Sequence, residues 1–358
     1  MNRDKIMTFI KKSLSFLPDK TYIKLYYRLR VGRKLNTNNP TTLNEKLQWL
    51  KFNYRFPLQS IVSDKLLVRD YVKEKIGAEY LIPILGIWGK YDDIDFSLLP
   101  KQFVLKCNHD SGGLVVCTDK DKLNHSETRC KIEKSLKSNF FYIGREYQYR
   151  NIKPMILCEE FISDNGKVPL DYKIYCFNGV PDVILVCRDR FSKNSHRASY
   201  LFFDQEWIFQ PLNKGDEDLQ ETDIPKPENL DEMIEIAKKL SRDFLFARID
   251  LYNIGGKIYF GELTFSPDSG FEEFSPSKWD NYLGEWIEIP GGILIYNKGY
   301  VIWIHEKDVD LKNDELKDYK FYCFNGKVKM CGIYSDRNSE KRTKADYYDR
   351  DFNWIDMT

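Results

Sequence analysis

Two runs of β-branched and aromatic residues on either side of a glycine pair constrain the fold of this chain most strongly. They span residues 247–252 and 257–264, and Gly255 and Gly256 lie between them. This pattern is typical of a β-hairpin, because glycine readily adopts the backbone angles of a tight turn. Since side chains alternate along a strand, the hairpin is predicted to have two chemically different faces.

Three charged residues are predicted to share one of these faces. Arg248 and Asp250 lie two residues apart in the first strand, and Glu262 lies in the second. With a three-residue loop over 254–256, Arg248 is expected opposite Glu262. Asp250 is then a diagonal neighbour of Glu262. Because Mg²⁺ binds one or two protein carboxylates and completes its shell with substrate phosphates, the face favours a magnesium–phosphate site. The alternative is a half-exposed hairpin with a surface ion pair.

Composition excludes several classes of protein. The 358 residues give room for two or three domains. The chain has 55 basic and 54 acidic residues, a net charge of +1, which argues against a nucleic-acid partner because such proteins carry a clear basic excess. Aromatic residues make up 15% of the chain, a content that is incompatible with long disorder.

The cysteines and histidines do not indicate a transition-metal site. The chain has eight cysteines and four histidines. No cysteines form a C-x-x-C pair, and most lie in apolar runs, so they are expected to be small buried residues in a reducing compartment. The histidines show no ligand spacing. We therefore expect a cytoplasmic protein.

The beginning of the chain is predicted to be an amphipathic helix. Lys11 and Lys12 interrupt the apolar residues of 6–17, and no apolar run reaches the ~18 residues that a membrane span requires. A basic stretch follows at Lys24, Arg28, Arg30, Arg33 and Lys34. Such a segment is expected to pack on the body of the protein; peripheral contact with an anionic membrane is the alternative.

Hydrophobic periodicity predicts an α+β fold. Helical spacing is found at 42–51, 64–76, 129–136 and 230–240, and the first of these begins with a capping-box pattern of threonine and Glu45. Strand-like runs occur at 103–107, 114–117, 155–162, 172–177 and 183–187.

The chain also contains an internal repeat. Residues 171–210 align without gaps to 318–357 and are identical at 16 of 40 positions. The later copy is followed by no second Arg-x-Asp hairpin within this sequence. We interpret it as a partial duplication or a truncated reading frame, with an interaction module as the alternative.

Two further segments are candidates for nucleotide contacts. Lys106 ends a strand and is followed by a polar turn that contains Gly112 and Gly113. Such turns can wrap backbone N–H groups around phosphates, although an ordinary β-turn has the same pattern. The acidic strand end at 159–162 could hold an adenine and a ribose, or could simply end in solvent.

The order of these segments resembles the ATP-grasp superfamily, and more closely its TupA-like branch, which is linked to bacterial cell-surface polysaccharide biosynthesis. The resemblance covers roughly residues 20–290. It rests on the motifs at 42–51, 103–113, 171–179, 259–265 and 283–287.

The resemblance implies an ATP-grasp fold, in which two α+β subdomains clasp a nucleotide behind a helical N-terminal region. The implied divisions are a helical region at 1–60, a subdomain with the glycine loop at 61–162, a metal and nucleotide subdomain at 163–290, and the partial repeat at 291–358. It also implies ATP and Mg²⁺ as cofactors.

The resemblance further implies roles for individual residues. Lys106 would contact the phosphates, and Ser111, Gly112 and Gly113 would close over them. The adenine hinge would be formed by Glu159, Glu160, Phe161 and Ile162. Lys173 would approach the nucleotide, Asp250 and Glu262 would bind magnesium, and Arg248 would stabilise the transferred phosphoryl group. Thr264 stands where the superfamily often has asparagine, which puts a two-metal site in doubt.

The function implied by the resemblance is an ATP- and Mg²⁺-dependent ligase. A carboxylate would be activated as an acylphosphate and then attacked by an amine or a similar nucleophile of a small-molecule or polysaccharide-precursor acceptor. The alternatives are a glycosyltransferase of the same pathway, for which no Asp-x-Asp between apolar strands is found, and a degenerate, non-catalytic binding protein.

Overall fold

The computed structural model describes residues 16–164, 166, 168–188, 199–212 and 224–289, and beyond these the backbone of six strands between 292 and 355. The helix expected over residues 6–17 therefore lies almost entirely outside the described residues. The chain divides into two compact units. One comprises Met1–Pro290 and Tyr296–Ile302, and the other Gly291–Ile295 and Trp303–Thr358.

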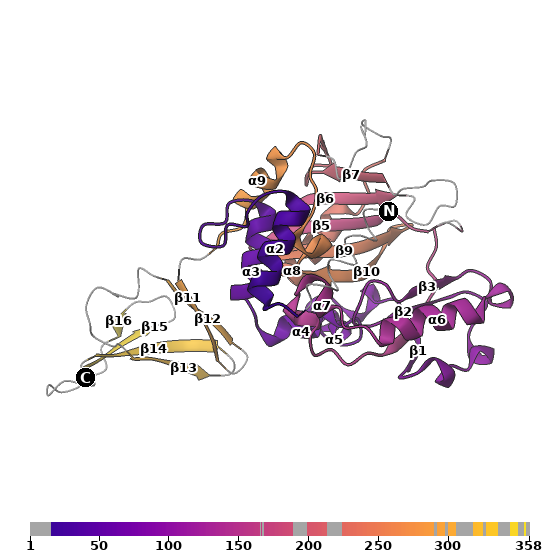
Figure 1. The fold of residues 1–358 in the computed structure, drawn as a ribbon, viewed down its shortest axis with the longest axis horizontal. Helices are drawn as coiled ribbons and strands as arrows, with labels where there is room; N and C mark the ends of the chain where they lie inside the picture. Colours follow the sequence, from indigo (N-terminus) through magenta and orange to yellow (C-terminus); the bar gives the residue numbers. More distant parts are fainter. Residues whose placement is uncertain are drawn as a thin grey trace. The chain divides into compact units, whose positions relative to one another are not determined.

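A four-stranded antiparallel sheet forms one part of the first unit (Figure 1). Its strands are ordered β1-β4-β2-β3. They span Ile84–Trp88 (β1), Phe103–Cys107 (β2), Leu114–Cys117 (β3) and Ile156–Glu160 (β4). Helix α6 (His125–Leu136) packs on β2 and β3. The strands predicted from the periodicity of 103–107 and 114–117 are confirmed.

A six-stranded antiparallel sheet forms the second part of this unit. Its order is β10-β9-β5-β6-β7-β8, so the hairpin β9–β10 pairs with β5. The strands span Asp171–Phe177 (β5), Val180–Arg188 (β6), Ser199–Phe203 (β7), Phe209–Gln210 (β8), Phe246–Ile254 (β9) and Lys257–Thr264 (β10). Helix α8 (Leu230–Ser241) covers one face of this sheet, where it contacts β5, β6 and β9.

The described part of the N-terminal region, from residue 16 onward, is largely helical. It contains α2 (Asp19–Val31), α3 (Leu43–Asn53), α4 (Pro57–Ser63) and α5 (Val68–Lys75). Thr42 caps α3 in the predicted capping box with Glu45. Helix α2 packs on the body of the unit through buried residues that include Tyr22 and Tyr26. Shorter helices are α7 (Phe141–Gly144) and α9 (Lys278–Glu285), with 3₁₀ turns η1 (Ala78–Tyr80), η2 (Tyr91–Asp93), η3 (Phe96–Leu98), η4 (Lys120–Lys122), η5 (Tyr147–Tyr149) and η6 (Pro267–Gly270).

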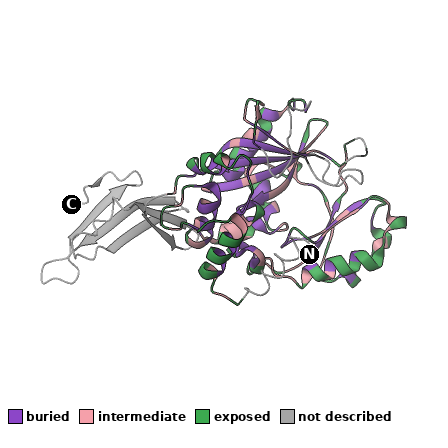
Figure 2. Cartoon of the chain, turned by 45° about the horizontal axis from the view of Figure 1, so that its top comes forward, coloured by how far each residue is buried: buried purple, intermediate pink, exposed green. Residues whose placement is uncertain are grey.

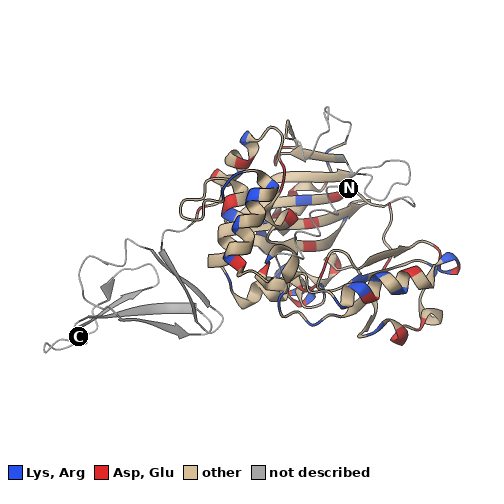
Figure 3. Cartoon of the chain, viewed as in Figure 1, with Lys and Arg blue, Asp and Glu red and all other residues tan. Residues whose placement is uncertain are grey.

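A large hydrophobic core of the first unit lies between the six-stranded sheet and α8. Ile174, Ile249 and Leu263 face it from three adjacent strands, and Met233 and Leu240 face it from the helix. Figure 2 shows this pattern, with buried residues along the central strands. Because side chains alternate, the residues between these apolar positions lie on the opposite face of the sheet. The charged residues of β5, β9 and β10 occupy these intervening positions. Figure 3 shows where charged residues lie along the strands.

The second unit contains a four-stranded antiparallel meander, β13-β14-β15-β16. Its strands span Asp318–Phe324, Lys327–Ser335, Lys344–Asp349 and Trp354–Ile355; β11 (Gly292–Asn297) and β12 (Tyr300–His305) form a separate pair. The β13–β14 register repeats that of β5–β6. Tyr322 pairs with Met330 as Tyr175 pairs with Val183, and each first strand has an irregularity directly after the tyrosine.

Within the part of the chain that the structure describes, no helix combines the length and the apolar composition needed to cross a membrane.

Candidate active site

The hairpin loop is one residue shorter than the sequence analysis predicted. Ile254 pairs with Lys257, so only Gly255 and Gly256 form the loop. Both glycines have positive φ, 57° and 81°, as the tight turn between two antiparallel strands requires. The predicted pairing of Arg248 with Glu262 is therefore wrong.

A β-bulge at Gly261 shifts the pairing a second time. Leu251 pairs with Phe260, but Asp250 pairs with Glu262. A Cβ at Gly261 would lie 3.1 Å from the Asp250 carbonyl oxygen, so glycine suits this close approach. A shift of one residue in the pairing moves a strand's side chains to the other face of the sheet. Two such shifts return them to the original face. Asp250 and Glu262 therefore lie directly opposite each other, not diagonally, and remain on one face.

Strand β5 completes this face. Lys173 pairs with Asp250 across the β5–β9 ladder, so Lys173, Asp250 and Glu262 form one row over three strands. Tyr175, Arg248 and Thr264 form the next row. The register thus gathers four of the predicted site residues, Lys173, Arg248, Asp250 and Glu262, from segments up to 89 positions apart.

The charged groups of this face form an ion-pair network. The Arg248 guanidinium donates from Nε to Asp250 Oδ1 at 2.7 Å and from a terminal nitrogen to Asp250 Oδ2 at 2.9 Å. Lys173 Nζ also donates to Asp250 Oδ2 and lies 2.7 Å from Asp171 Oδ2. Asp250 is only 4% exposed. Both of its oxygens thus accept charge-assisted hydrogen bonds in a water-poor setting.

These charges control the protonation of Asp250. Burial alone would raise the pKa of its carboxyl group, but the charges of Arg248 and Lys173 outweigh burial and hold the pKa below its usual value. Burial would likewise lower the pKa of the Arg248 guanidinium, and the Asp250 carboxylate instead holds it well above its usual value. Asp250 is therefore ionised at neutral pH.

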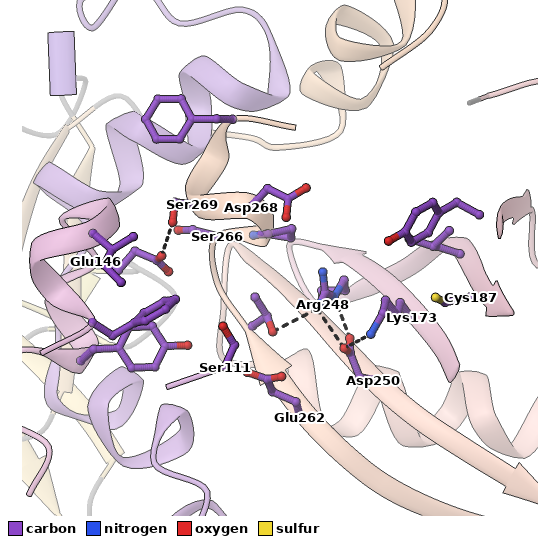
Figure 4. A pocket seen from close by; sticks show the side chains of 18 of the residues that line it. Ser111, Glu146, Lys173, Cys187, Arg248, Asp250, Glu262, Ser266, Asp268 and Ser269 are labelled. Atoms are coloured by element: carbon purple, nitrogen blue, oxygen red, sulfur yellow. Dashed lines mark hydrogen bonds and ion pairs between the residues drawn. The ribbon is translucent and has the colours of Figure 1, made fainter. Parts of the chain in front are cut away.

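A cavity of about 500 Å³ opens over this face. Figure 4 shows Lys173, Arg248 and Asp250 on one side of it, Glu146 and Ser269 on the other, and Ser111 and Glu262 between them. The other lining residues are Tyr26, Arg30, Phe140, Ile143, Tyr149, Leu185, Cys187, Tyr200, Thr264, Ser266, Pro267, Asp268 and Phe271.

A second, smaller cavity adjoins the first. It is lined by Lys65, Arg69, Lys106 and Glu159 together with Glu262, which also lines the larger cavity. Lys106 Nζ lies 2.5 Å from a Glu159 carboxylate oxygen, and an Arg69 guanidinium nitrogen lies 3.8 Å from the other. Glu262 therefore connects the hairpin face with the cationic residues around β2 and β4.

The predicted glycine loop is a tight turn held by Asp110. One Asp110 carboxylate oxygen accepts a hydrogen bond from the Gly113 N–H at 3.0 Å, and the other accepts one from Ser135 Oγ at 2.5 Å. Lys65 Nζ donates to the Asp110 carbonyl oxygen. Ser111 at the tip of the turn lines the larger cavity, whereas Gly112 and Gly113 line neither cavity.

The predicted adenine segment is divided between the cavity and solvent. Glu159 is buried, Phe161 and Ile162 are half-buried, and Glu160 is exposed. Only Glu159 lines one of the two cavities. The Glu160 N–H donates to the Pro83 carbonyl oxygen at 3.0 Å, which holds the end of β4 in place.

We expect Gly113→Ala to lower the free energy of unfolding by about 1–3 kcal/mol, because an added methyl group overpacks the turn. A Cβ at Gly113 would lie 2.3 Å from Ser135 Oγ and 2.7 Å from Cys107 Sγ. Urea denaturation measures the change. Gly89→Ala is the control, since a Cβ there meets nothing within 4 Å; equal effects of the two substitutions would contradict the prediction.

Sequence analysis missed several residues of the two cavities. Lys65 and Arg69 lie before and in α5 and carry no motif beyond their spacing of four. Glu146 precedes η5, in a segment without clear periodicity. Asp268 and Ser269 follow a proline in a turn-forming run, which signals a loop but not a site.

The two hairpin carboxylates suit a magnesium ion. Asp250 and Glu262 are paired across β9 and β10 and line the same cavity. Among the described residues, no cluster of three or more His, Cys, Asp or Glu could hold a metal ion. A pair of carboxylates fits Mg²⁺, which takes its remaining oxygen ligands from water and substrate phosphates.

Comparison with known proteins places the chain in a family. The family model described as TupA-like ATPgrasp matches residues 45–288 and 300–358. No curated protein matches the sequence.

Solved structures with a similar fold are distant in sequence. The D-alanine–D-alanine ligase of Bacillus anthracis, solved with ATP, is 14% identical over 75% of this chain and 83% of its own, with a TM-score of 0.36. The L-amino acid ligase of Bacillus licheniformis is 13% identical over 75% of this chain and 56% of its own, with a TM-score of 0.39. The ATP-grasp ligase PsnB, complexed with its minimal precursor, Mg and ADP, is 11% identical over 73% of this chain and 66% of its own, with a TM-score of 0.33. The family match covers most of the sequence, and the chain belongs to the TupA-like ATP-grasp family.

Proposed function

We propose that this protein is an ATP- and Mg²⁺-dependent ligase that joins a carboxylate to an acceptor through an acylphosphate. The observation that carries the proposal is the row of Lys173, Asp250 and Glu262 beside Arg248, which lines a cavity of about 500 Å³. Carboxylates and cations in such a row are suited to hold a metal-bound triphosphate and to balance charge on a transferred phosphoryl group.

Different residues around the two cavities would bind the metal ion and the phosphates. Asp250 and Glu262 would hold Mg²⁺, which when bound neutralises phosphate charge. Lys106 lines the second cavity together with Glu262 and would contact the phosphates, and Ser111 would approach them from the tip of its turn. Glu159 would orient Lys106 through their ion pair. Lys65 and Arg69 supply further cationic groups beside these residues.

Arg248 is the group that would stabilise the transferred phosphoryl group. Its side chain is 12% exposed, and its bidentate bond to Asp250 fixes its direction. Because the charge is held in place before substrate binds, little reorganisation is needed during the reaction. Lys173 would keep Asp250 ionised and would itself face the nucleotide.

The family's link to polysaccharide biosynthesis supports a role in the assembly of a bacterial cell surface, with a small molecule or a polysaccharide precursor as acceptor. We propose a cytoplasmic location. Peripheral contact with a membrane through the basic N-terminal region is part of this proposal, because Lys24 and Arg28 are exposed on α2.

A non-catalytic binding protein is the second candidate. Both Asp250 oxygens accept hydrogen bonds from Arg248 or Lys173, so a metal ion must displace or share these bonds. If it cannot, the hairpin network only stabilises the sheet. A glycosyltransferase remains the third class to be tested.

Thermal unfolding with MgATP, with UDP-glucose as the parallel ligand, tests the proposal. At about 100 times its dissociation constant a ligand stabilises the fold by about 2.7 kcal/mol. For a chain of this size that raises Tm by about 4 °C. We expect this rise with MgATP alone. A rise with UDP-glucose alone would support the glycosyltransferase class, and no rise with either would support the non-catalytic one.

A further inference from the structure

The end of the larger cavity that faces away from β5 and β9 contains a buried carboxylate. Glu146 is 2% exposed and lines the cavity. Its Oε1 accepts a hydrogen bond from Ser269 Oγ at 2.7 Å, and its Oε2 accepts one from Gln148 Nε2 at 3.2 Å. An ionised carboxylate offers about four acceptor positions. Glu146 therefore keeps the capacity to accept donors from a ligand.

The charges around Glu146 favour a cationic ligand. Lys51 is the basic residue that acts on it, whereas Glu262 and Asp268 are acidic. Burial, the largest effect, raises the pKa of the Glu146 carboxyl group, and the two acidic neighbours raise it further against the opposing effect of Lys51. Arg30 also lines the cavity but is paired with Glu273 at 2.8 Å. With these groups ionised, Glu146 and Asp268 therefore give this end two negative charges against the one positive charge of Lys51.

Aromatic rings also line this cavity, and the backbone N–H of one of these residues, Tyr149, donates to the Glu146 carbonyl oxygen at 3.2 Å. Tyr26 and Phe271 meet edge to face with their centroids 4.9 Å apart, and Phe140 and Tyr149 meet edge to face at 5.1 Å. All four line the cavity. Aromatic faces attract ammonium groups, and they offer flat apolar surfaces to a ring-shaped ligand.

A strained loop holds these groups in place. Asp268 and Ser269 both have left-handed backbone angles, with φ of 45° and 56°. Such angles cost about 1–3 kcal/mol per residue outside glycine and cluster at functional sites. Gln48 Nε2 on α3 donates to the carbonyl oxygens of Ser269 and Gly270, and these bonds fix the loop toward Glu146.

We propose that this end of the cavity binds the acceptor as an amino sugar, with its primary ammonium group on Glu146 and its ring between the two aromatic pairs. The inference rests on the proposed ligase function and identifies the acceptor of that same site. Ser266, Asp268 and Ser269 line the cavity beside Glu146 and would accept or donate hydrogen bonds to the ring hydroxyls. Glu146 acts here as the residue that determines acceptor specificity.

Ligand titration by saturation-transfer NMR on the full chain tests the inference. The probes are D-glucosamine and N-acetyl-D-glucosamine, which has the same ring but no ammonium group. We expect the full chain to bind glucosamine at least 10-fold more tightly than the acetylated sugar. We expect Glu146→Gln to weaken glucosamine binding at least 10-fold.

Two controls separate this inference from misfolding and from the proposed function. Glu272→Gln removes another buried carboxylate, which accepts a bond from the Tyr175 hydroxyl at 2.9 Å but lines neither cavity; it should leave glucosamine binding unchanged. Glu146→Gln should leave the Tm at pH 8 unchanged, because glutamine has the same shape and burial disfavours the ionised carboxylate. The variant should also keep the rise in Tm with MgATP.

Each remaining outcome contradicts either the acceptor site or the proposed ligase function. Absent glucosamine binding, equal binding of both sugars, or equal binding by the wild type and Glu146→Gln overturns the acceptor site. If MgATP does not raise the Tm of the wild type, the proposed ligase function is contradicted, regardless of the result with the two sugars.

Discussion

Asp250→Asn is expected to lower the free energy of unfolding by about 3 kcal/mol or more, because it leaves two buried cations without their shared counter-ion. Arg248 would keep a 3.4 Å bond to Thr264 Oγ1, and Lys173 would keep Asp171. For a chain of this size the loss lowers Tm by about 4 °C or more. Calorimetry at neutral pH measures it.

The control for this prediction is an exposed ion pair. Asp243 pairs with Lys75 at 3.1 Å, and the Asp243 side chain is 44% exposed. Asp243→Asn should therefore cost at most about 1 kcal/mol, since solvent screens such pairs. If both substitutions cost the same, the hairpin network contributes no more than a surface pair, and our account of it is wrong.

The cost of Asp250→Asn should also depend on pH. The folded-state pKa of Asp250 is lowered, so its stabilising effect is fully present above the unfolded-state pKa of about 3.9 and is lost as the pH falls through the lower folded-state value. The difference in stability between wild type and variant should be constant from pH 5 to 8 and should shrink only in acid. A difference that shrinks between pH 6 and 8 would contradict this assignment.

Glu262→Gln is expected to reduce turnover about 100-fold or more and to abolish the rise in Tm with MgATP, while it leaves the fold stable. Glu262 is half-buried and lines both cavities, so its carboxylate faces the ligand site and contributes little to the packing of the core. The amide keeps the shape of the side chain but removes the negative charge that a magnesium ion requires.

ADP release and thermal unfolding measure these effects. Glu235→Gln is the matched control, because Glu235 lies on the exposed face of α8 and pairs only loosely with Lys238, at 3.7 Å. It should change neither turnover nor the MgATP response. If Glu262→Gln is active and shows the normal rise in Tm with MgATP, Glu262 is not a magnesium ligand. The proposal that the cavity binds MgATP through it is then wrong.

Local signals were enough to predict the helices and strands that carry most of the candidate site. Helix α3 was predicted because Thr42 and Glu45 form its cap from positions three apart, and α8 because its apolar residues recur at helical spacing. Strands β2, β3, β5 and β9 are short apolar runs bounded by turn residues. Each of these signals lies within about ten residues, so it can be read without knowledge of the fold.

The register of the site could not be predicted in the same way. The bulge at Gly261 depends on the close approach of the Asp250 carbonyl and of the Tyr252 ring. Only the packed sheet brings these groups together, and the sequence between the strands does not signal it. The shorter loop and the bulge each shift the pairing by one residue, and the two shifts cancel. The residues of the charged face were therefore predicted correctly although the predicted pairing was wrong.

The sequence alone therefore determined which chemistry this protein carries: the strand with Arg248 and Asp250, the strand with Glu262, and the lysines that precede and face them. Tertiary structure decided where that chemistry acts. Glu146 reaches the cavity because Ser269, 123 positions later in the chain, donates a hydrogen bond to it. A contact of that kind depends on how separate elements pack, and no local pattern of residues encodes it.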